Sequence, residues 1–347
     1  MAFVGVGQGG GRIAETFFHL GYGRVGVINT AKADLDEVDD AITKLDFATG
    51  GAGKDPEYGR AAAEGRDEQI WDLLTRAVGN KPEYLMVCAS LGGGTGSGAT
   101  PKVIEVARKY MTECGADPAR VGVIVSLPDP HDGHTVCRNA VYAFEKIYKL
   151  APSPMVIIDN KRIDELYREQ GKPLGFGKLF TACNQQVAKL FHLFNRLAVQ
   201  RSKLMTFDRA DYATLLDAGV VVFGASAIAK FESPADISEA VRKQLSDTLL
   251  AQVDLRKGKR AGCIFVGSQK ILDTTPLDFF GGGFNMLNRM LADESMVHQG
   301  VYIGNSEDLR CYTMIGQLPP PVERLKQLAS KAAIPSQGIA AFLGVQD

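Results

Sequence analysis

Two glycine-rich segments of the chain have the composition of phosphate-binding loops. The first runs from Gly5 to Arg12 with the sequence GVGQGGGR, between an apolar run and a segment of helical periodicity. Glycines let backbone N–H groups approach phosphate oxygens, and the N-terminus of a helix adds partial positive charge. Gly5, Gly7 and Gly10 also fit the dinucleotide pattern GxGxxG. A dinucleotide site and a tight turn without a ligand therefore both stay open for this segment.

The second segment, 90–98, is the stronger signal for a polyphosphate. It has the sequence SLGGGTGSG, with five glycines between positions 92 and 98. Ordering so many glycines costs much chain entropy, and bare amide donors around a polyphosphate give a reason for that cost. The Gly-Lys-Ser/Thr ending of a P-loop is absent. A dinucleotide-binding motif accounts for only one such segment, and this chain has two. We therefore expect a nucleoside polyphosphate site.

Other polar residues could do chemistry, and each also has an ordinary structural explanation. Asp208 and Asp211 have the spacing of an N-cap residue and a first-turn acid at the start of a helix. His131 and His134 have a spacing seen in metal sites, but no third ligand is suggested, so we interpret them as solvated. Asp34 suits the ribose carboxylate of a dinucleotide site, or else a surface position at a helix start.

The elements that must position these residues follow an alternating pattern in the first half of the chain. Apolar strands separated by helices predict a parallel sheet covered on both faces, with ligands at the carboxyl ends of its strands. The expected strands are 3–6, 24–29, 84–89, 121–126 and 154–159, and the expected helices are 12–20, 67–78, 101–114 and 135–150.

A long helical pattern over 178–200 leads to a second, smaller α/β unit. Its expected strands are 219–223, 261–266, 299–303 and 310–315, and its expected helices are 234–252 and 278–294. The proline triplet 319–321 predicts the end of the fold, before a short basic helix and a tail. The fold class is therefore α/β, divided into a nucleotide-binding domain (1–175), a connecting helix (176–203), a second domain (204–318) and a tail (319–347).

The composition narrows the classes of partner. Basic and acidic residues nearly balance, at 39 and 40, which argues against direct binding of a nucleic-acid backbone. No apolar run approaches the ~20 residues needed to cross a bilayer, and no leader pattern opens the chain. The six cysteines lie far apart without a CxxC pair, so we expect reduced, mostly buried thiols in a cytoplasmic protein without direct membrane insertion.

The sequence GGGTGSG at Gly92–Gly98 resembles the signature loop of the tubulin/FtsZ superfamily. The resemblance extends over roughly residues 2–318, and Gln8, Ser90 and Leu91 make both glycine segments more similar to tubulin than to bacterial FtsZ. It implies a parallel-sheet GTP-binding domain, a central helix and a GTPase-activating C-terminal domain. It also implies a protein that binds GTP or GDP with Mg²⁺, hydrolyses GTP and assembles with itself head to tail into filaments.

The resemblance assigns phosphate-binding roles residue by residue. The signature loop would wrap the α- and β-phosphates with Gly93, Gly94, Thr95 and Gly96. The first glycine segment would lie under the phosphates through Gln8, Gly9, Gly10, Gly11 and Arg12, with Gln8 also helping to hold magnesium. Ala52 and Gly53 would place their amides on the γ-phosphate. Lys54, where asparagine is common in the family, either adds a cation there or is simply solvated.

The sugar and the base would be bound by other loops. Asp132 replaces the family's ribose-binding glutamate, and Arg138 lies two positions beyond the family's arginine. Asn160 follows a strand as in tubulin, and Asn184 corresponds to the position that binds the guanine ring. A side-chain amide can accept from guanine N1 and N2 and donate to O6, which favours guanine over adenine.

The resemblance places hydrolysis between subunits. Asp208 and Asp211 would enter the neighbouring subunit's site and polarise the attacking water, which we favour over a purely helix-starting role. Thr206 replaces the family's asparagine, so a GTP-binding filament or adaptor protein with little or no turnover stays an alternative. An NAD-dependent oxidoreductase is a remote alternative that leaves the second glycine segment unexplained. Cell division, DNA segregation and cell-shape control all remain open as cellular roles.

The C-terminal residues 339–347 faintly resemble the peptide by which FtsZ proteins dock to membrane-tethering partners. The basic residues that follow the family peptide are absent here. The hypothesis is therefore a membrane-tethering or adaptor partner bound through the tail, and the alternative is a tail that folds back or stays disordered.

Overall fold

The computed structural model describes residues 1–335, apart from the side chain of Phe176. By their internal contacts these residues form two compact units. Unit 1 comprises Met1–Asp164, Pro173–Ala188 and the segment that begins at Val322, and unit 2 comprises Glu165–Lys172 and Lys189–Pro321. The division at positions 175, 203 and 318, which assigns a function to each part, stays a prediction. Every helix in the described part of the chain is too short or too polar to cross a membrane.

The sheet of unit 1 is parallel, with its strands in the order β3-β2-β1-β4-β5-β6. Apart from β3 and the last residue of β4, the strands are buried along their whole length, which explains their near-continuous apolar sequences. The strands are β1 Ala2–Val6, β2 Val25–Asn29, β3 Thr43–Asp46, β4 Leu85–Ser90, β5 Val121–Leu127 and β6 Met155–Asp159. The α/β class with a parallel sheet is thereby confirmed.

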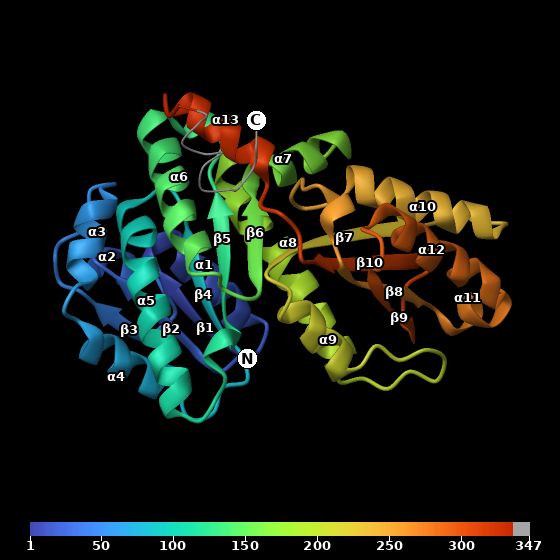
Figure 1. Cartoon of the computed structure of the whole chain (residues 1–347), viewed down its shortest axis with the longest axis horizontal. Helices are drawn as coiled ribbons and strands as arrows, with labels where there is room; N and C mark the ends of the chain where they lie inside the picture. The colour runs from blue at the N-terminus through green and yellow to red at the C-terminus, as the bar shows by residue number, and fades with distance from the viewer. Residues whose placement is uncertain (336–347) are drawn as a thin grey trace. The chain divides into compact units, whose positions relative to one another are not determined.

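Helices cover both faces of this sheet. Right-handed crossovers place α1 on one face and α4, α5 and α6 on the other, and Figure 1 shows α5 and α6 in front of the strands. The helices are α1 Gly7–His19, α2 Lys32–Asp36, α3 Pro56–Ala63, α4 Asp67–Ala77, α5 Gly94–Glu113 and α6 His134–Lys149, with short 3₁₀ turns η1 Pro118–Arg120 and η2 Pro130–Asp132.

The strand order reverses between β1 and β4, which are neighbours in the sheet although β2 and β3 separate them in the chain. Ligands of open α/β sheets bind in the crevice at such a switch point. Both glycine-rich segments follow these two strands. Gly7–Gly11 form the first turns of α1 and Gly94–Gly98 the first turn of α5, so both are helix N-termini rather than the loops expected before helices at 12 and 101.

Helix α13, Val322–Lys331, follows the proline triplet and packs on α6. Its Arg324 is buried: Nε donates to Asp159 Oδ1 at 3.0 Å, and Nη2 donates to the Pro128 carbonyl oxygen at 2.6 Å. Burial raises the pKa of Asp159 above its ordinary value, although the Arg324 guanidinium acts to lower it. Unit 1 therefore continues past the triplet at which the sequence predicted an end.

Unit 2 has a mixed sheet in the order β7-β10-β8-β9, in which β10 is antiparallel to β7 and β8 while β8 and β9 are parallel. Helices α10 and α12 pack together on one face, and α9 contacts β8 and β10. The elements are β7 Val220–Ile228, β8 Arg260–Gly267, β9 Met296–Ile303, β10 Leu309–Gly316, α9 Arg209–Leu216, α10 Pro234–Asp247, α11 Gln269–Thr274, α12 Leu277–Met290 and the turn η3 Leu255–Lys257.

Two helices begin in unit 1 and end in unit 2, namely α7 Asn160–Glu169 and α8 Phe176–Leu197. The sequence predicted α8 closely but gave no sign of α7. It also missed β3 and the short helices α3 and α11, which lack enough turns for a clear apolar period. The starts of α2 and α9 correspond to the helix-starting interpretations of Asp34 and of Asp208 with Asp211. All six cysteines are free thiols, and all except Cys114 are buried.

Candidate functional site

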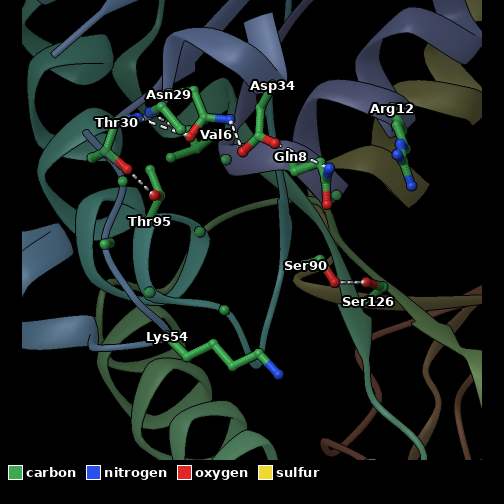
Figure 2. Close-up of a pocket in the computed structure, with 18 of the residues that line it drawn as sticks. Val6, Gln8, Arg12, Asn29, Thr30, Asp34, Lys54, Ser90, Thr95 and Ser126 are labelled. Carbon is green, nitrogen blue, oxygen red and sulfur yellow. Dashed lines mark hydrogen bonds between the residues drawn. The ribbon is translucent and has the colours of Figure 1, made fainter. Parts of the chain in front are cut away.

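A cavity of about 460 Å³ opens at the switch point of unit 1. Its walls come from the carboxyl ends of β1, β2 and β4, the first turns of α1 and α5, the 51–54 loop and the start of α8 (Figure 2). Twelve of the residues predicted to bind the nucleotide line it: Gln8, Gly9, Arg12, Ala52, Gly53, Lys54, Gly93, Gly94, Thr95, Gly96, Asn160 and Asn184.

The N-terminus of α5 forms one wall of the cavity. Gly93 is its N-cap residue and is exposed, and Gly94, Thr95 and Gly96 of the first turn, whose amides have no partner within the helix, line the cavity. Close packing explains two other glycines: a Cβ atom on Gly94 would lie 2.6 Å from Ala52 Cβ, and one on Gly96 would lie 2.7 Å from the Ser90 carbonyl oxygen. The absence of side chains thus brings the 51–54 loop and β4 directly against the helix start, where partial positive charge gathers.

Hydroxyl groups fix the helix start to its neighbours. Thr95 Oγ1 and Thr30 Oγ1, the latter at the end of β2, lie 2.6 Å apart in a buried hydrogen bond that Figure 2 shows. The Ser97 hydroxyl accepts from the Gly92 amide at 3.0 Å. These contacts leave the amides of the first turn free while holding the helix start in place.

Asn139 on α6 was not anticipated from the sequence, yet it joins the Lys54 loop to the loop that precedes α5. Its buried amide nitrogen donates to the Lys54 carbonyl oxygen at 2.7 Å and to the Gly92 carbonyl oxygen at 3.1 Å. Lys54 has a left-handed backbone with φ of 61°. This conformation costs a non-glycine residue roughly 1 kcal/mol, and the contact from Asn139 helps to hold it.

A polar cluster lies on the side of the cavity opposite Lys54 in Figure 2. Asp34 Oδ1 accepts from Gln8 Nε2 at 3.1 Å, and Asp34 Oδ2 accepts from Asn29 Nδ2 at 3.0 Å. Since its amide nitrogen is used in this way, Gln8 has its side-chain oxygen available to a ligand. Asp34 therefore orients two side chains of the cavity, a role that neither sequence interpretation of Asp34 gave.

Two amides and a ring also line the cavity. Asn160 is 6% exposed, and its Oδ1 atom is buried without a hydrogen-bond partner in the described structure. Buried acceptors are nearly always satisfied, so an unpaired one points to a ligand donor. Asn184 and Phe180, both in the first half of α8, line the same cavity. The cavity can therefore offer hydrogen bonds and an apolar surface to a planar base.

Four predicted nucleotide-binding residues do not line the cavity. A Cβ atom on Gly10 would lie 2.2 Å from the Cys88 carbonyl oxygen, and one on Gly11 would lie 3.1 Å from Val27 Cγ1, so both glycines let α1 pack closely on the sheet. Asp132 is exposed and caps η2 by accepting from the Asp129 amide at 2.9 Å. Arg138 is exposed on α6. The predicted nucleotide roles of these four stay predictions.

The two predicted catalytic carboxylates begin α9 in unit 2. Asp208 is the N-cap, and its Oδ1 atom accepts from the amides of Ala210 and Asp211 at 2.8 and 2.9 Å. Asp211 Oδ2 accepts from the Asp208 amide at 3.1 Å, which completes a capping box. The helix-starting role is thus present, and Asp208 retains one carboxylate oxygen without a protein partner among the described residues. Thr206 donates to the Ser202 carbonyl oxygen and accepts from its amide.

Comparison with known proteins adds to this geometry. The model of the tubulin/FtsZ family GTPase domain matches residues 1–168. The cell division protein FtsZ of Porphyromonas gingivalis is 28% identical over 284 residues, which is 79% of this chain and 58% of that protein. Residues 1–168 belong to the tubulin/FtsZ superfamily. The tubulin-like protein CetZ2 of Haloferax volcanii is 30% identical over 196 residues, 54% of this chain and 51% of CetZ2.

The chain spans between 58% and 65% of the length of the first FtsZ relatives that it matches. Solved structures share its fold. CetZ2 from Haloferax volcanii, in a GTPγS-bound protofilament, has a TM-score of 0.76 at 21% identity, covering 96% of this chain and 97% of CetZ2. TubZ of Bacillus thuringiensis serovar israelensis, in a GTPγS-form protofilament, has a TM-score of 0.79 at 19% identity, covering 96% of this chain and 90% of TubZ.

Proposed function

We propose that this protein binds Mg·GTP in the cavity of unit 1, hydrolyses it, and assembles with itself head to tail into filaments. The observation that carries the proposal is the cavity itself. Its lining combines the N-termini of α1 and α5 with the side-chain amides of Asn160 and Asn184. Family membership and the protofilament structures of CetZ2 and TubZ support the same conclusion.

The phosphate chain would lie along the first turn of α5. Free amides at Gly94–Gly96 and the helix dipole suit anionic oxygens, and the amides of Ala52 and Gly53 approach from the facing loop. The Lys54 side chain extends along the wall of the cavity (Figure 2) and would add a cation at the γ-phosphate. A triphosphate would therefore contact more of the protein than a diphosphate does.

The base would lie between Asn160, Asn184 and Phe180. The unpartnered Asn160 oxygen suits the N–H donors of guanine, and an amide can meet both donor and acceptor edges of that ring. Binding of guanine in preference to adenine follows, because adenine would leave a buried amide group unpaired. A competition titration of bound fluorescent GDP with GTP and ATP tests this directly, and equal affinities would contradict the base assignment.

Magnesium fits the donor set near Gln8. The side-chain oxygen of Gln8, together with phosphate oxygens, would hold the ion, whose charge would offset that of the phosphates. Among the described residues, no group of three or more His, Cys, Asp or Glu side chains could hold a metal alone. The ion would therefore bind with the nucleotide rather than before it.

Hydrolysis would use carboxylates from a second subunit. Of the residues that line the cavity, Asp34 is the one carboxylate, and its two oxygens accept from Gln8 and Asn29. Groups that polarise the attacking water must then come from elsewhere, which supports insertion of Asp208 and Asp211 from a neighbouring copy. Phosphoryl transfer to water needs mainly positioning and charge neutralisation, so such a site needs no further nucleophile.

The turnover assay distinguishes this proposal from a GTP-binding filament or adaptor protein without hydrolysis. That alternative draws support from Thr206, whose hydroxyl is engaged by Ser202 within its own loop. Turnover per molecule should rise steeply with protein concentration, because each site is completed by assembly. Asp211→Ala should reduce turnover severely, about 100-fold or more, while the Kd for GTP stays unchanged. A loss of GTP binding instead would show that Asp211 serves its own subunit.

The proposed tail partner involves residues 339–347, which lie outside the described residues. We propose a membrane-tethering or adaptor protein as its partner. Chains without residues 336–347 should assemble and hydrolyse GTP normally in vitro but lose their position in the cell. Cell division, DNA segregation and cell-shape control are all compatible with the proposed filament, and fluorescence imaging of the tagged protein distinguishes a ring at the division site from the other two.

A further inference from the structure

His298 on β9 forms a close pair with Asp211, although the sequence gave no sign of it. Its Nδ1 atom lies 2.8 Å from Asp211 Oδ1, and the side chains of His298 and Asp211 are 12% and 28% exposed. On the other side of the ring, Nε2 lies 2.9 Å from Thr214 Oγ1. The imidazole is therefore held between two residues of α9 and fixes one oxygen of a predicted catalytic carboxylate.

The hydrogen-bond geometry bears on the charge of this ring. The hydroxyl of Thr214 has one hydrogen, and Thr214 Oγ1 lies 2.7 Å from the Asp211 carbonyl oxygen and 2.9 Å from Nε2. Both contacts form together when Thr214 donates to the carbonyl oxygen and the ring donates from Nε2. An ionised carboxylate only accepts, so Nδ1 then carries a hydrogen as well. The arrangement that satisfies all three contacts is an imidazolium paired with the Asp211 carboxylate.

The surroundings of the ring agree with this charge. Asp208 lies at the start of the same helix as Asp211, and burial chiefly, with these two carboxylates adding to it, raises the pKa of Tyr302 on β9. Tyr302 is thus a neutral phenol, and it donates to backbone carbonyl oxygens. Arg260 on the neighbouring strand β8 contacts a methionine sulfur. The charged groups named around His298 are thus the carboxylates of Asp208 and Asp211 and the guanidinium of Arg260.

We propose that His298 is the positioning residue for Asp211 and acts as its counter-cation during GTP hydrolysis. This inference rests on the proposed function, in which Asp211 is brought against the triphosphate of a neighbouring subunit. A carboxylate in that place meets repulsion from the phosphates, which favours its displacement. The imidazolium opposes this displacement, because it attracts Oδ1 directly.

The same contacts give the two carboxylates different tasks. Both oxygens of Asp211 are engaged, by His298 and by the Asp208 amide. Asp208 keeps Oδ2 without a protein partner among the described residues. Asp208 is therefore the acid with an oxygen available to the attacking water, and Asp211, held by His298, fixes the Asp208 backbone through the capping box.

Two measurements test the inference. The first is an ¹⁵N-histidine NMR spectrum of the GDP-bound protein at neutral pH. The signals of His298 are those that are present in the wild type and absent from His298→Asn. They should be the signals of a ring with both nitrogens protonated.

The second is a GTPase assay. His298→Leu should lower kcat by about 10- to 100-fold through misplacement of Asp211, with KM and the assembly threshold unchanged. His298→Asn keeps a donor to Asp211 and should recover part of kcat. The control is His19→Asn, which changes an exposed histidine of α1.

Unchanged kcat in both His298 variants of an active protein would overturn the inference. An unprotonated Nδ1 or Nε2 in the NMR spectra would overturn it even if His298→Leu does not fold. Wild-type protein without turnover would instead overturn the proposed function, and the role of His298 in hydrolysis with it.

Discussion

Gly93→Ala separates the phosphate role of the α5 N-terminus from its role in the fold. Gly93 has φ of −81° and ψ of 176°, which any residue can adopt, and a Cβ atom there would meet no protein atom within 4 Å. Alanine at such a position gains about 0.4–1 kcal/mol through the unfolded chain. Alanine is a poorer N-cap residue than glycine, which offsets this gain at the start of α5. We therefore expect a midpoint of thermal unfolding that is nearly unchanged.

The same methyl group should weaken nucleotide binding. It would occupy the open side of the helix start, from which phosphate oxygens reach the free amides. Loss of one hydrogen bond to a charged group costs about 1.5–3 kcal/mol, which raises Kd about 10- to 150-fold. Affinity thus falls while stability is kept, a combination that general damage to the fold cannot produce.

The assay is a titration with fluorescent GDP, displaced by GTP, on proteins whose unfolding midpoints are measured in parallel. Gly23→Ala is the matched control, because a Cβ atom there also meets nothing within 4 Å, and Gly23 does not line the cavity. Gly98→Ala is the opposite case: its Cβ would lie 1.9 Å from the Pro56 carbonyl oxygen, so stability should fall. Wild-type affinity in Gly93→Ala would refute phosphate binding at this helix start.

Two further predictions concern the buried pair of Arg324 and Asp159 and the recognition of the base by Asn184. Arg324→Met leaves Asp159 buried without its cation and should cost about 3–5 kcal/mol in urea unfolding at pH 7. Because burial raises the folded-state pKa of Asp159 above its ordinary value, ionised Asp159 costs stability, and the loss should shrink as the pH falls below about 4, where the acid is protonated in both states. An equal loss at both pH values would show that packing, not charge, dominates. Asn184→Leu should lower the affinity for GTP about 10-fold or more while leaving that for ATP nearly unchanged. Parallel losses for both nucleotides in the competition titration would argue against guanine recognition by Asn184.

Local pattern was enough to predict the strands of both units except β3, and the resemblance to the tubulin/FtsZ family supplied twelve of the residues that line the cavity. The strands of unit 1 have continuous apolar sequences, and Gly93–Gly96 lie in a motif whose spacing is itself the signal. The same pattern could not separate two uses of glycine. Gly10 and Gly96 both exclude a Cβ atom, but Gly10 does so for packing against Cys88 and does not line the cavity. A glycine motif shows that a side chain is absent, but it does not show whether protein atoms or a ligand occupy the space.

The residues that the sequence could not give depend on contacts between distant parts of the chain. Asn139 is 85 positions from Lys54, and Arg324 is 165 positions from Asp159. His298 belongs to a strand that was recognised only from 299 onward, and its partner Thr214 is 84 positions away. An asparagine on a helix or an arginine after a proline triplet has no local mark of burial, because the fold alone supplies its partners.

The amide of Asn139 has a consequence for the speed and strength of binding. Its hydrogen bonds connect the Lys54 loop to the loop before α5 without any ligand. The two sides of the proposed phosphate site therefore keep their spacing in the free protein. An incoming nucleotide then meets a preorganised site and loses little affinity to the ordering of loops. Association should accordingly proceed at the rate of a docking encounter rather than of a conformational change, and nucleotide exchange should be governed by dissociation.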